Sequence, residues 1–281
     1  MKILNKPNLG LSPNFNLSLL TSPPRKNRGW VRLFFLFLTP FALCFFISSP
    51  LSGADLTADQ ILEKIDDNMV IDQAVSVATM IIHSRSGSRE IQSKSWSRGS
   101  DSAYVEYLKP SREKGKKMLK VGDKIYNYSP EPNDRIITIS GHLLRQSVMG
   151  SDLSYEDMME NDEMQEDYTA EIIGKEDFEG NDCYVLELTA KQKDLAYYSR
   201  KMWVDSQRFL PLKEERFAKS GRLLKRTEIH DYMKVDNRWY PKHMTFKDML
   251  SRGKGTEYII NSIDFNADIP KNLFTKAALR K

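Results

Sequence analysis

Cysteine is scarce in this 281-residue sequence, which contains only Cys44 and Cys183. Two cysteines cannot build the disulfide framework of a small secreted scaffold, and they do not form the closely spaced pair of a zinc site. The four histidines are scattered, at His83, His142, His230 and His243. No two of them have the spacing of a zinc-binding motif. The sequence therefore predicts no metal site and no cofactor.

Motifs for catalysis and nucleotide binding are also missing. The sequence has no G-x-S-x-G element, no P-loop and no dinucleotide fingerprint. Serine, histidine and aspartate are present, as in almost any chain of this length, so their presence identifies no triad. We predict a protein that is not an enzyme and has no catalytic residues. The alternative is an enzyme whose site is assembled only in three dimensions, with a polar pocket and a pKa-shifted group.

Long apolar runs are absent as well, because the main one, residues 33–47, is shorter than the about 20 residues of a membrane-spanning helix. It follows a basic flank and ends in small residues up to Ala54, as secretory signal peptides do. We predict an N-terminal extension and signal peptide over residues 1–54, cleaved after Ala54, and one exported domain over residues 55–281. An uncleaved N-terminal anchor is the alternative.

Acidic residues are missing from residues 1–54, which contain six Lys/Arg and no Asp/Glu. The predicted mature domain therefore keeps 36 of the 42 basic residues and all 38 acidic ones, and its net charge is −2. A nucleic-acid-binding domain would carry a basic face instead, so we predict no nucleic-acid partner. With Cys183 as its one cysteine, this domain must be held together by burial, for which its 227 residues suffice.

The clearest helical pattern runs from Leu56 to Met69. Thr57 and Gln60 have the spacing of a capping box, and the apolar residues that follow fall at helical intervals. The apolar side of this helix needs a sheet to cover.

From Val75 onward apolar and polar residues alternate, and turn residues recur at short intervals. The predicted strands are residues 75–83, 90–97, 102–108, 117–121, 124–128, 135–139, 168–173, 183–189, 202–204, 210–217, 223–231, 239–250 and 256–265. No β–helix–β rhythm of a doubly wound nucleotide fold occurs. The pattern predicts an antiparallel all-β domain with helical cover, a β-rich α+β fold.

The strand pattern breaks between residues 141 and 166. Residues 142–149 can form a short helix that Gly150 ends, and Ser154 and Asp157 have capping-box-like spacing for a second one. The acidic stretch that follows lacks the central glycine of a calcium loop. We interpret it as a solvated acidic face on a loop.

Four stretches of the predicted β domain share features with one known family. They are the strands and turns from Trp203-Val204-Asp205 through Leu210-Pro211-Leu212-Lys213 to Ser220-Gly221-Arg222-Leu223-Leu224-Lys225, the hairpin over residues 115–130, the segment over residues 149–157, and the tail Ile269–Thr275. Together they resemble the outer-membrane lipoprotein-sorting family, the LolA/LolB-like proteins. The Gly-Ser-Asp-x-Ser-Tyr-Glu-Asp motif from Gly150 resembles a branch of that family other than its best-known carriers.

The resemblance implies an antiparallel sheet curled into a half-open barrel, with helices closing its concave side around a hydrophobic cavity. It also implies a periplasmic carrier that binds a lipid, or the acyl chains of a lipoprotein, and ferries it between the inner and outer membranes. An inner-membrane transporter would be its partner, and we expect a monomer. The departure in residues 141–166 leaves the identity of the cargo open.

Aromatic residues and methionine are frequent in the predicted strands, and methionine is an adaptable lining for acyl chains. The lipid-cavity candidates are Trp96, Tyr104, Leu119, Tyr126, Tyr128, Leu186, Leu188, Trp203, Phe217, Met244 and Phe246. The lid candidates are Leu143, Leu144, Met149 and Tyr155. Alternatively these residues fill a solid core. The protein would then be a non-catalytic accessory or scaffold subunit of an inner-membrane lipid or RND-type exporter.

Overall fold

The structure is a computed structural model that describes residues 56–281 except 131, 161–163 and 194. The predicted signal peptide, Cys44 and the cleavage position at Ala54 lie outside the described residues. Within those residues no helix combines the length and the apolar character needed to cross a membrane.

In the described part of the chain, thirteen strands form one antiparallel sheet. They are β1 (Gln73–Ser84), β2 (Gly87–Arg98), β3 (Ser102–Lys109), β4 (Lys117–Val121), β5 (Lys124–Ser129), β6 (Arg135–Ile139), β7 (Tyr168–Phe178), β8 (Asn181–Ala190), β9 (Ser199–Asp205), β10 (Pro211–Phe217), β11 (Leu223–Val235), β12 (Arg238–Asp248) and β13 (Gly255–Asp264). The spatial order runs from β6 to β1 and then from β13 to β7, so the first strand pairs with the last in the middle of the sheet.

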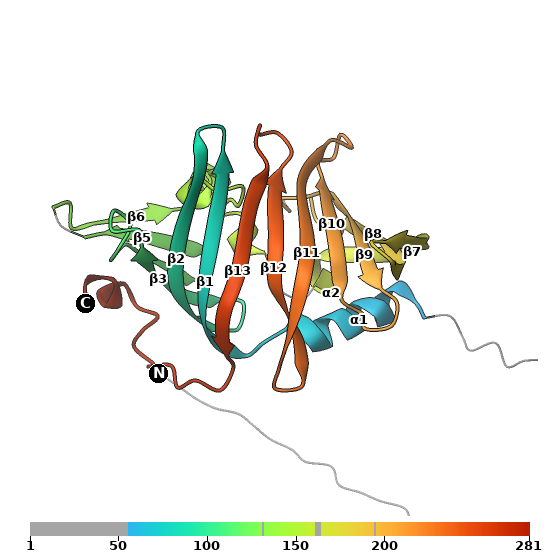
Figure 1. The fold of residues 1–281 in the computed structure, drawn as a ribbon, viewed down its shortest axis with the longest axis horizontal. Coiled ribbons are helices and arrows are strands. Elements are labelled where there is room, and N and C mark those ends of the chain that lie inside the picture. The colour runs from blue at the N-terminus through green and yellow to red at the C-terminus, as the bar shows by residue number, and fades with distance from the viewer. Residues whose placement is uncertain (1–55, 131, 161–163, 194) are drawn as a thin grey trace, which may run out of the picture. The chain divides into compact units, whose positions relative to one another are not determined.

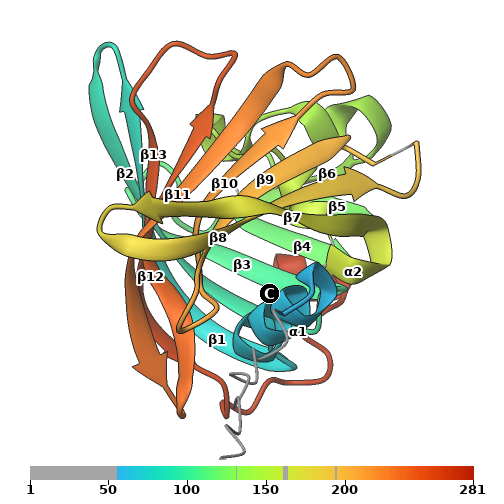
Figure 2. The same ribbon diagram turned by 90° about the vertical axis from the view of Figure 1, so that its right-hand side faces the viewer.

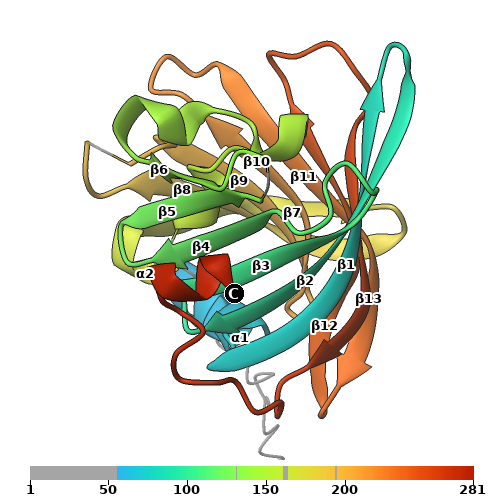
Figure 3. The same cartoon turned by 90° about the vertical axis from the view of Figure 1, so that its left-hand side faces the viewer.

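The sheet is strongly curled. Figure 1 views its middle strands, and Figures 2 and 3 show β7 and β8 on one side of the curl and β3 to β5 on the other. This confirms the predicted antiparallel, half-open architecture. Within the described residues the helical cover is smaller than predicted, because it consists of a helix of twelve residues, a helix of four residues and short 3-10 turns.

Helix α1 (Ala58–Met69) forms where the sequence predicts it. The capping box is present, since the Gln60 amide donates to Thr57 Oγ1 at 3.2 Å and the Thr57 amide donates to Gln60 Oε1 at 2.9 Å. The buried side of α1 packs on Leu186 and Leu188. Figures 2 and 3 place the helix between the two curled halves of the sheet, on its concave side.

The hairpin between β7 and β8 differs from the prediction. Strand β7 continues to Phe178 instead of ending at residue 173, and the turn is reduced to Glu179 and Gly180. Both turn residues have positive φ, 51° and 82°, as a two-residue hairpin loop requires. The short turn lets the two strands pair along their whole length.

Residues 140–160, here called the connecting segment, follow β6 and lead toward β7. They contain three 3-10 turns, η1 (Gly141–Arg145), η2 (Val148–Gly150) and η3 (Asp157–Met159), and α2 (Met164–Asp167) lies just before β7. The predicted helix over residues 142–149 is therefore two separate turns, since Gln146 is extended and Ser147 bridges Ser154. The contacts at Ser154 and Asp157 are those of a capping box, with Ser154 N donating to Asp157 Oδ2 at 2.7 Å and Asp157 N to Ser154 Oγ at 3.2 Å.

Both faces of the sheet carry apolar clusters. On the concave side, one cluster around Val105 and Met118 lies under the connecting segment, and a second one lies under α1. On the outer side, Tyr104 and Leu119 lie under the C-terminal turn η4 (Lys276–Arg280), which Figure 3 shows in front of β3 and β4. Neighbouring residues of one strand therefore serve opposite faces.

Candidate functional site

The structure divides the eleven predicted cavity residues between the two faces. Leu186 and Leu188 lie on the concave face under α1, and Met244 and Phe246 lie there next to Tyr258. The outer face holds Trp96, Tyr104, Leu119, Tyr126 and Tyr128 in the cluster beneath the C-terminal turn, and Trp203 in a separate cluster with Cys183. Phe217 is half-buried at a bulge of β10. These residues therefore share no single surface, and their role in lipid binding stays a prediction.

The four predicted lid residues do lie together. Leu143, Leu144 and Met149 are partly buried against the concave cluster of β1 to β6, and Tyr155 is part of that cluster. Asn127 Nδ2 on β5 donates to the Tyr155 hydroxyl at 2.5 Å. The connecting segment thus covers the apolar concave surface of this half of the sheet.

Polar contacts fasten the connecting segment to the other half of the sheet through Asp152. Its carboxylate accepts from Thr256 Oγ1 at 2.8 Å and from the Asp248 amide at 2.9 Å, and Lys225 Nζ donates to its carbonyl at 2.6 Å. From the half of the sheet that the segment covers, Arg89 Nη2 of β2 donates to the Met149 carbonyl. The segment is therefore held from both sides of the curl.

Five charged side chains on the concave side form what we call the charge cluster: Asp157, Glu160, Arg200, Glu214 and Arg216. Arg200 Nη2 donates to Glu160 Oε1 at 2.7 Å, and Arg216 Nη1 lies 3.3 Å from Glu160 Oε2. Glu214 joins the same arginines, accepting from Arg200 Nη1 and from Arg216 Nη2, each at 2.9 Å. Asp157 Oδ1 lies 3.3 Å from Arg216 Nη1. Two carboxylates of the connecting segment therefore reach arginines of β9 and β10.

The carboxylates of the charge cluster are not equivalent. Burial acts to raise the pKa of Glu214, but Arg216 and Arg200 lower it to about 2. The pKa of Asp157 is also lowered, because Arg216 and the bonds from Ser154 outweigh its burial. The pKa of Glu160 is raised instead, because its burial outweighs the two arginines while Glu214 and Asp157 repel it. Glu160 is the carboxylate whose ionised form is least favoured.

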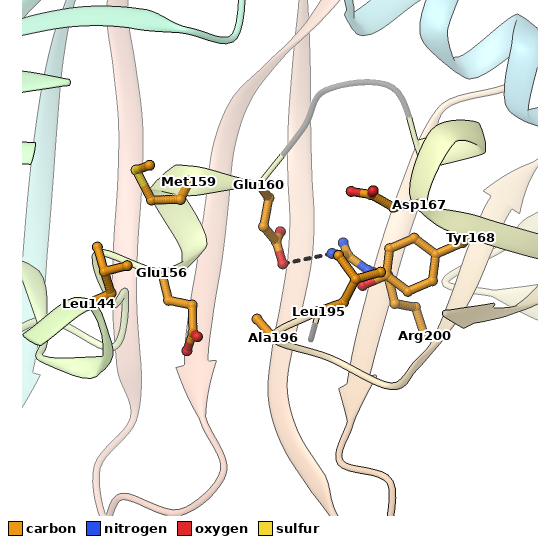
Figure 4. A pocket seen from close by; sticks show the side chains of 9 residues that line it. All are labelled: Leu144, Glu156, Met159, Glu160, Asp167, Tyr168, Leu195, Ala196 and Arg200. Atoms are coloured by element: carbon orange, nitrogen blue, oxygen red, sulfur yellow. Dashed lines mark hydrogen bonds and ion pairs between the residues drawn. The ribbon is translucent and has the colours of Figure 1, made fainter. Parts of the chain in front are cut away.

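A cavity of about 290 Å³ lies beside the charge cluster. Glu160 and Arg200 line it together with apolar side chains of Leu144, Met159 and Leu195. Figure 4 shows the ion pair between Glu160 and Arg200 facing this space, with the Tyr168 ring beside the guanidinium. A second cavity of about 600 Å³ shares Leu195 with the first and extends toward Lys225 and Leu250.

The described residues contain no group of three His, Cys, Asp or Glu side chains suited to hold a metal ion. Burial raises the pKa of the Cys183 thiol to about 11, so this thiol is protonated and a poor nucleophile near neutral pH. The arrangement suits the binding of a ligand, because it places the two arginines of the charge cluster beside an apolar surface.

Sequence reasoning missed the charge cluster. Glu214 and Arg216 stand in a strand, where charged residues indicate a solvated face, yet both are largely buried. The motif from Gly150 contains Asp152 and Asp157, but its residues alone do not indicate that their partners are Thr256 and Arg216. Only the curl of the sheet brings these positions together.

A family model described as "Uncharacterized protein" matches residues 99–281. No curated protein matches the chain.

Solved structures share the fold over most of the chain. A DUF1329 family protein from Desulfovibrio piger ATCC 29098 has a TM-score of 0.70 and 23% identity, covering 78% of this chain and 96% of that one. A domain described as an outer membrane lipoprotein-sorting protein, from Vibrio parahaemolyticus, has a TM-score of 0.69 and 23% identity, with 79% and 97% covered. A LolA superfamily protein from Nitrosomonas europaea has a TM-score of 0.65 and 25% identity, with 79% and 99% covered. The family resemblance read from the sequence is thereby confirmed, whereas its motif from Gly150 is not tested.

Proposed function

Because this chain belongs to the family whose model covers residues 99–281 and has the fold of LolA-superfamily outer-membrane lipoprotein-sorting proteins, we propose that it is a non-enzymatic carrier of a lipid or of the acyl chains of a lipoprotein. The proposal includes export to the periplasm, with residues 1–54 removed after Ala54. It also includes transport as a monomer between the inner and outer membranes, with an inner-membrane transporter as partner.

The observation that carries the proposal is the cover on the concave face. The apolar cluster of β1 to β6 is covered by a segment of short turns, which places Leu143, Leu144 and Met149 on it. An acyl chain that replaced these side chains would bury apolar surface in their place. Each CH₂ group withdrawn from water contributes about 0.8 kcal/mol. Cargo would therefore compete with the connecting segment for one surface.

A second function, that of an accessory subunit of an inner-membrane exporter, is favoured by one observation. The concave face is covered by the connecting segment and by α1, and the cavities of about 290 and 600 Å³ are lined in part by charged residues. Pockets for apolar ligands are usually 300 to 1,000 Å³ and mainly apolar. An accessory subunit would keep this face closed and use it as a core.

Native mass spectrometry separates the two functions. The protein would be purified without detergent from cells that export it, and any bound molecule would be released with organic solvent. A co-purifying lipid mass is expected for the carrier. A ligand-free mass, together with no uptake of a fluorescent fatty-acyl probe, would favour the accessory subunit.

A further inference from the structure

We propose that Arg200 and Arg216 form a binding site for the anionic headgroup of an amphiphile, a carboxylate or a phosphate, and that Glu160 occupies this site when no cargo is bound. The inference rests on the proposed function and adds to it the chemical class of the cargo. The apolar carrier surface alone would not distinguish a charged lipid from a neutral one.

The position of Glu160 is that of a ligand. Its two carboxylate oxygens face different arginines, Arg200 at 2.7 Å and Arg216 at 3.3 Å. A carboxylate or phosphate bound between two guanidinium groups presents its oxygens in the same way. Glu160 comes from the connecting segment, whereas Glu214 comes from the sheet itself. Moving only the end of the segment that carries Glu160 would therefore remove one anion and leave Asp157, Glu214 and both arginines in place.

Arg200 retains an unused donor. Its side chain is 5% exposed, and its Nε is the buried side-chain nitrogen or oxygen that lacks a hydrogen-bond partner among the described residues. Buried polar groups without partners are uncommon, and they mark positions where a ligand or water completes the site. Glu160 and Glu214 engage the two Nη atoms of Arg200 only. A phosphate headgroup has more oxygens than the Glu160 carboxylate and so has a further acceptor to offer Nε.

Charge balance favours replacement of the Glu160 carboxylate by an anionic headgroup over replacement by a neutral one. The charge cluster holds two arginines and three carboxylates, and Lys225 lies 3.7 Å from Asp157. Replacing Glu160 by a carboxylate or a singly ionised phosphate keeps that balance, whereas a neutral headgroup would leave a buried arginine underneutralised. The raised pKa of Glu160 supports its role as the exchangeable carboxylate.

The surroundings provide room for a chain. The cavity of about 290 Å³ next to Glu160 and Arg200 is walled by Leu144 and Met159, which pack on the first concave cluster, and by Leu195, which packs on the second. A headgroup at Arg200 thus places its acyl chain between the two apolar clusters.

The test compares four probes by isothermal titration calorimetry on the purified full protein: dodecanoate, dodecyl phosphate, dodecanol and inorganic phosphate. Glu160→Gln removes the internal charge while keeping a hydrogen-bonding side chain. We expect this variant to bind dodecanoate and dodecyl phosphate about ten-fold more tightly than the unmodified protein, the size of one charge-assisted hydrogen bond. Its affinity for dodecanol should not change.

Two further variants complete the design. Arg200→Lys retains the positive charge but loses Nε and the planar fork, so it should lose the preference for the anionic probes. Glu215→Gln is the matched control, since Glu215 pairs with Lys213 and Arg226 and lies outside the charge cluster. It should bind all probes as the unmodified protein does.

The outcomes separate this inference from the proposed function. Equal affinities for dodecanoate and dodecanol in all variants would overturn the headgroup site and leave the carrier intact. Absence of binding for every amphiphile would overturn the carrier itself. Equal affinities for inorganic phosphate and dodecyl phosphate would overturn the assignment of the ligand as an amphiphile. Glu160→Gln decides the headgroup site even if Arg200→Lys fails to fold.

Discussion

Asn127 on β5 donates a hydrogen bond of 2.5 Å to the hydroxyl of Tyr155 in the connecting segment. Removing that hydroxyl with Tyr155→Phe should lower the free energy of unfolding by about 1 kcal/mol, because the Asn127 amide loses its partner. Urea denaturation measures this loss. Tyr198→Phe is the control, since Tyr198 is 40% exposed. An equal loss in both variants would mean that the bond contributes nothing specific.

The double substitution Leu143→Asp and Leu144→Asp tests the connecting segment as a lid. Two carboxylates cannot pack on the apolar concave cluster without a large desolvation cost, so the segment should leave the surface. We expect uptake of a fluorescent fatty-acyl probe to become several-fold faster by stopped-flow fluorescence. Val121→Asp, at a residue that is 39% exposed, is the control. Unchanged probe binding in the double variant would show that the segment is not a lid.

Acid should destabilise the protein through Glu214. Its pKa falls from an ordinary value of 4.5 to about 2 in the folded protein, so the unfolded state takes up the proton first. This stabilisation, on the order of 3 kcal/mol, is complete above pH 4.5 and is lost as the pH falls toward 2. Asp157 acts in the same direction. Glu160, with a raised pKa, acts oppositely and costs stability once the pH rises through its folded value.

Thermal unfolding between pH 5 and pH 2 measures this effect. Glu214→Gln should reduce the pH dependence of the melting temperature in that window, because it removes the carboxylate whose pKa is lowered to about 2. In Glu215→Gln the melting temperature should change with pH as it does in the unmodified protein. If the melting temperature of Glu214→Gln still falls as steeply with acid, the acid sensitivity belongs to other carboxylates.

The thiol of Cys183 should be unreactive in the folded protein. It is 1% exposed, and burial raises its pKa to about 11. Labelling with a chromogenic disulfide reagent at pH 8 should be at least about 100-fold slower than in urea. A Cys183→Ser, Ser220→Cys variant, which moves the thiol to an exposed turn, should react at the rate of the unfolded chain. Fast labelling of native protein that lacks residues 1–54, and with them Cys44, would show that β8 opens readily.

Much of the fold could be predicted because its signals are local. Alternation located the strands, and Thr57 with Gln60 located the start of α1. Alternation cannot tell which face is concave when both are apolar, as at Tyr104 and Val105. For that reason the predicted cavity residues were divided between two surfaces.

The rest depended on contacts between distant residues. The predicted helix over residues 142–149 gave way to two turns, because packing on the concave cluster and the bridge from Ser147 to Ser154 override helical propensity. The charge cluster could not be predicted from the sequence either, because its members lie far apart in the chain. Arg200 is 40 residues from Glu160 in the chain, and each residue alone resembles a solvated surface residue.

The pairing of β1 with β13 also governs how the protein can be made. Val75 lies opposite Asp264, so the centre of the sheet stays incomplete until the chain has been synthesised as far as residue 264. Until then β1 presents an unpaired edge with apolar side chains, the kind of surface on which chains aggregate. A chain that ended before residue 255 would lack β13 and would leave this edge of β1 unpaired.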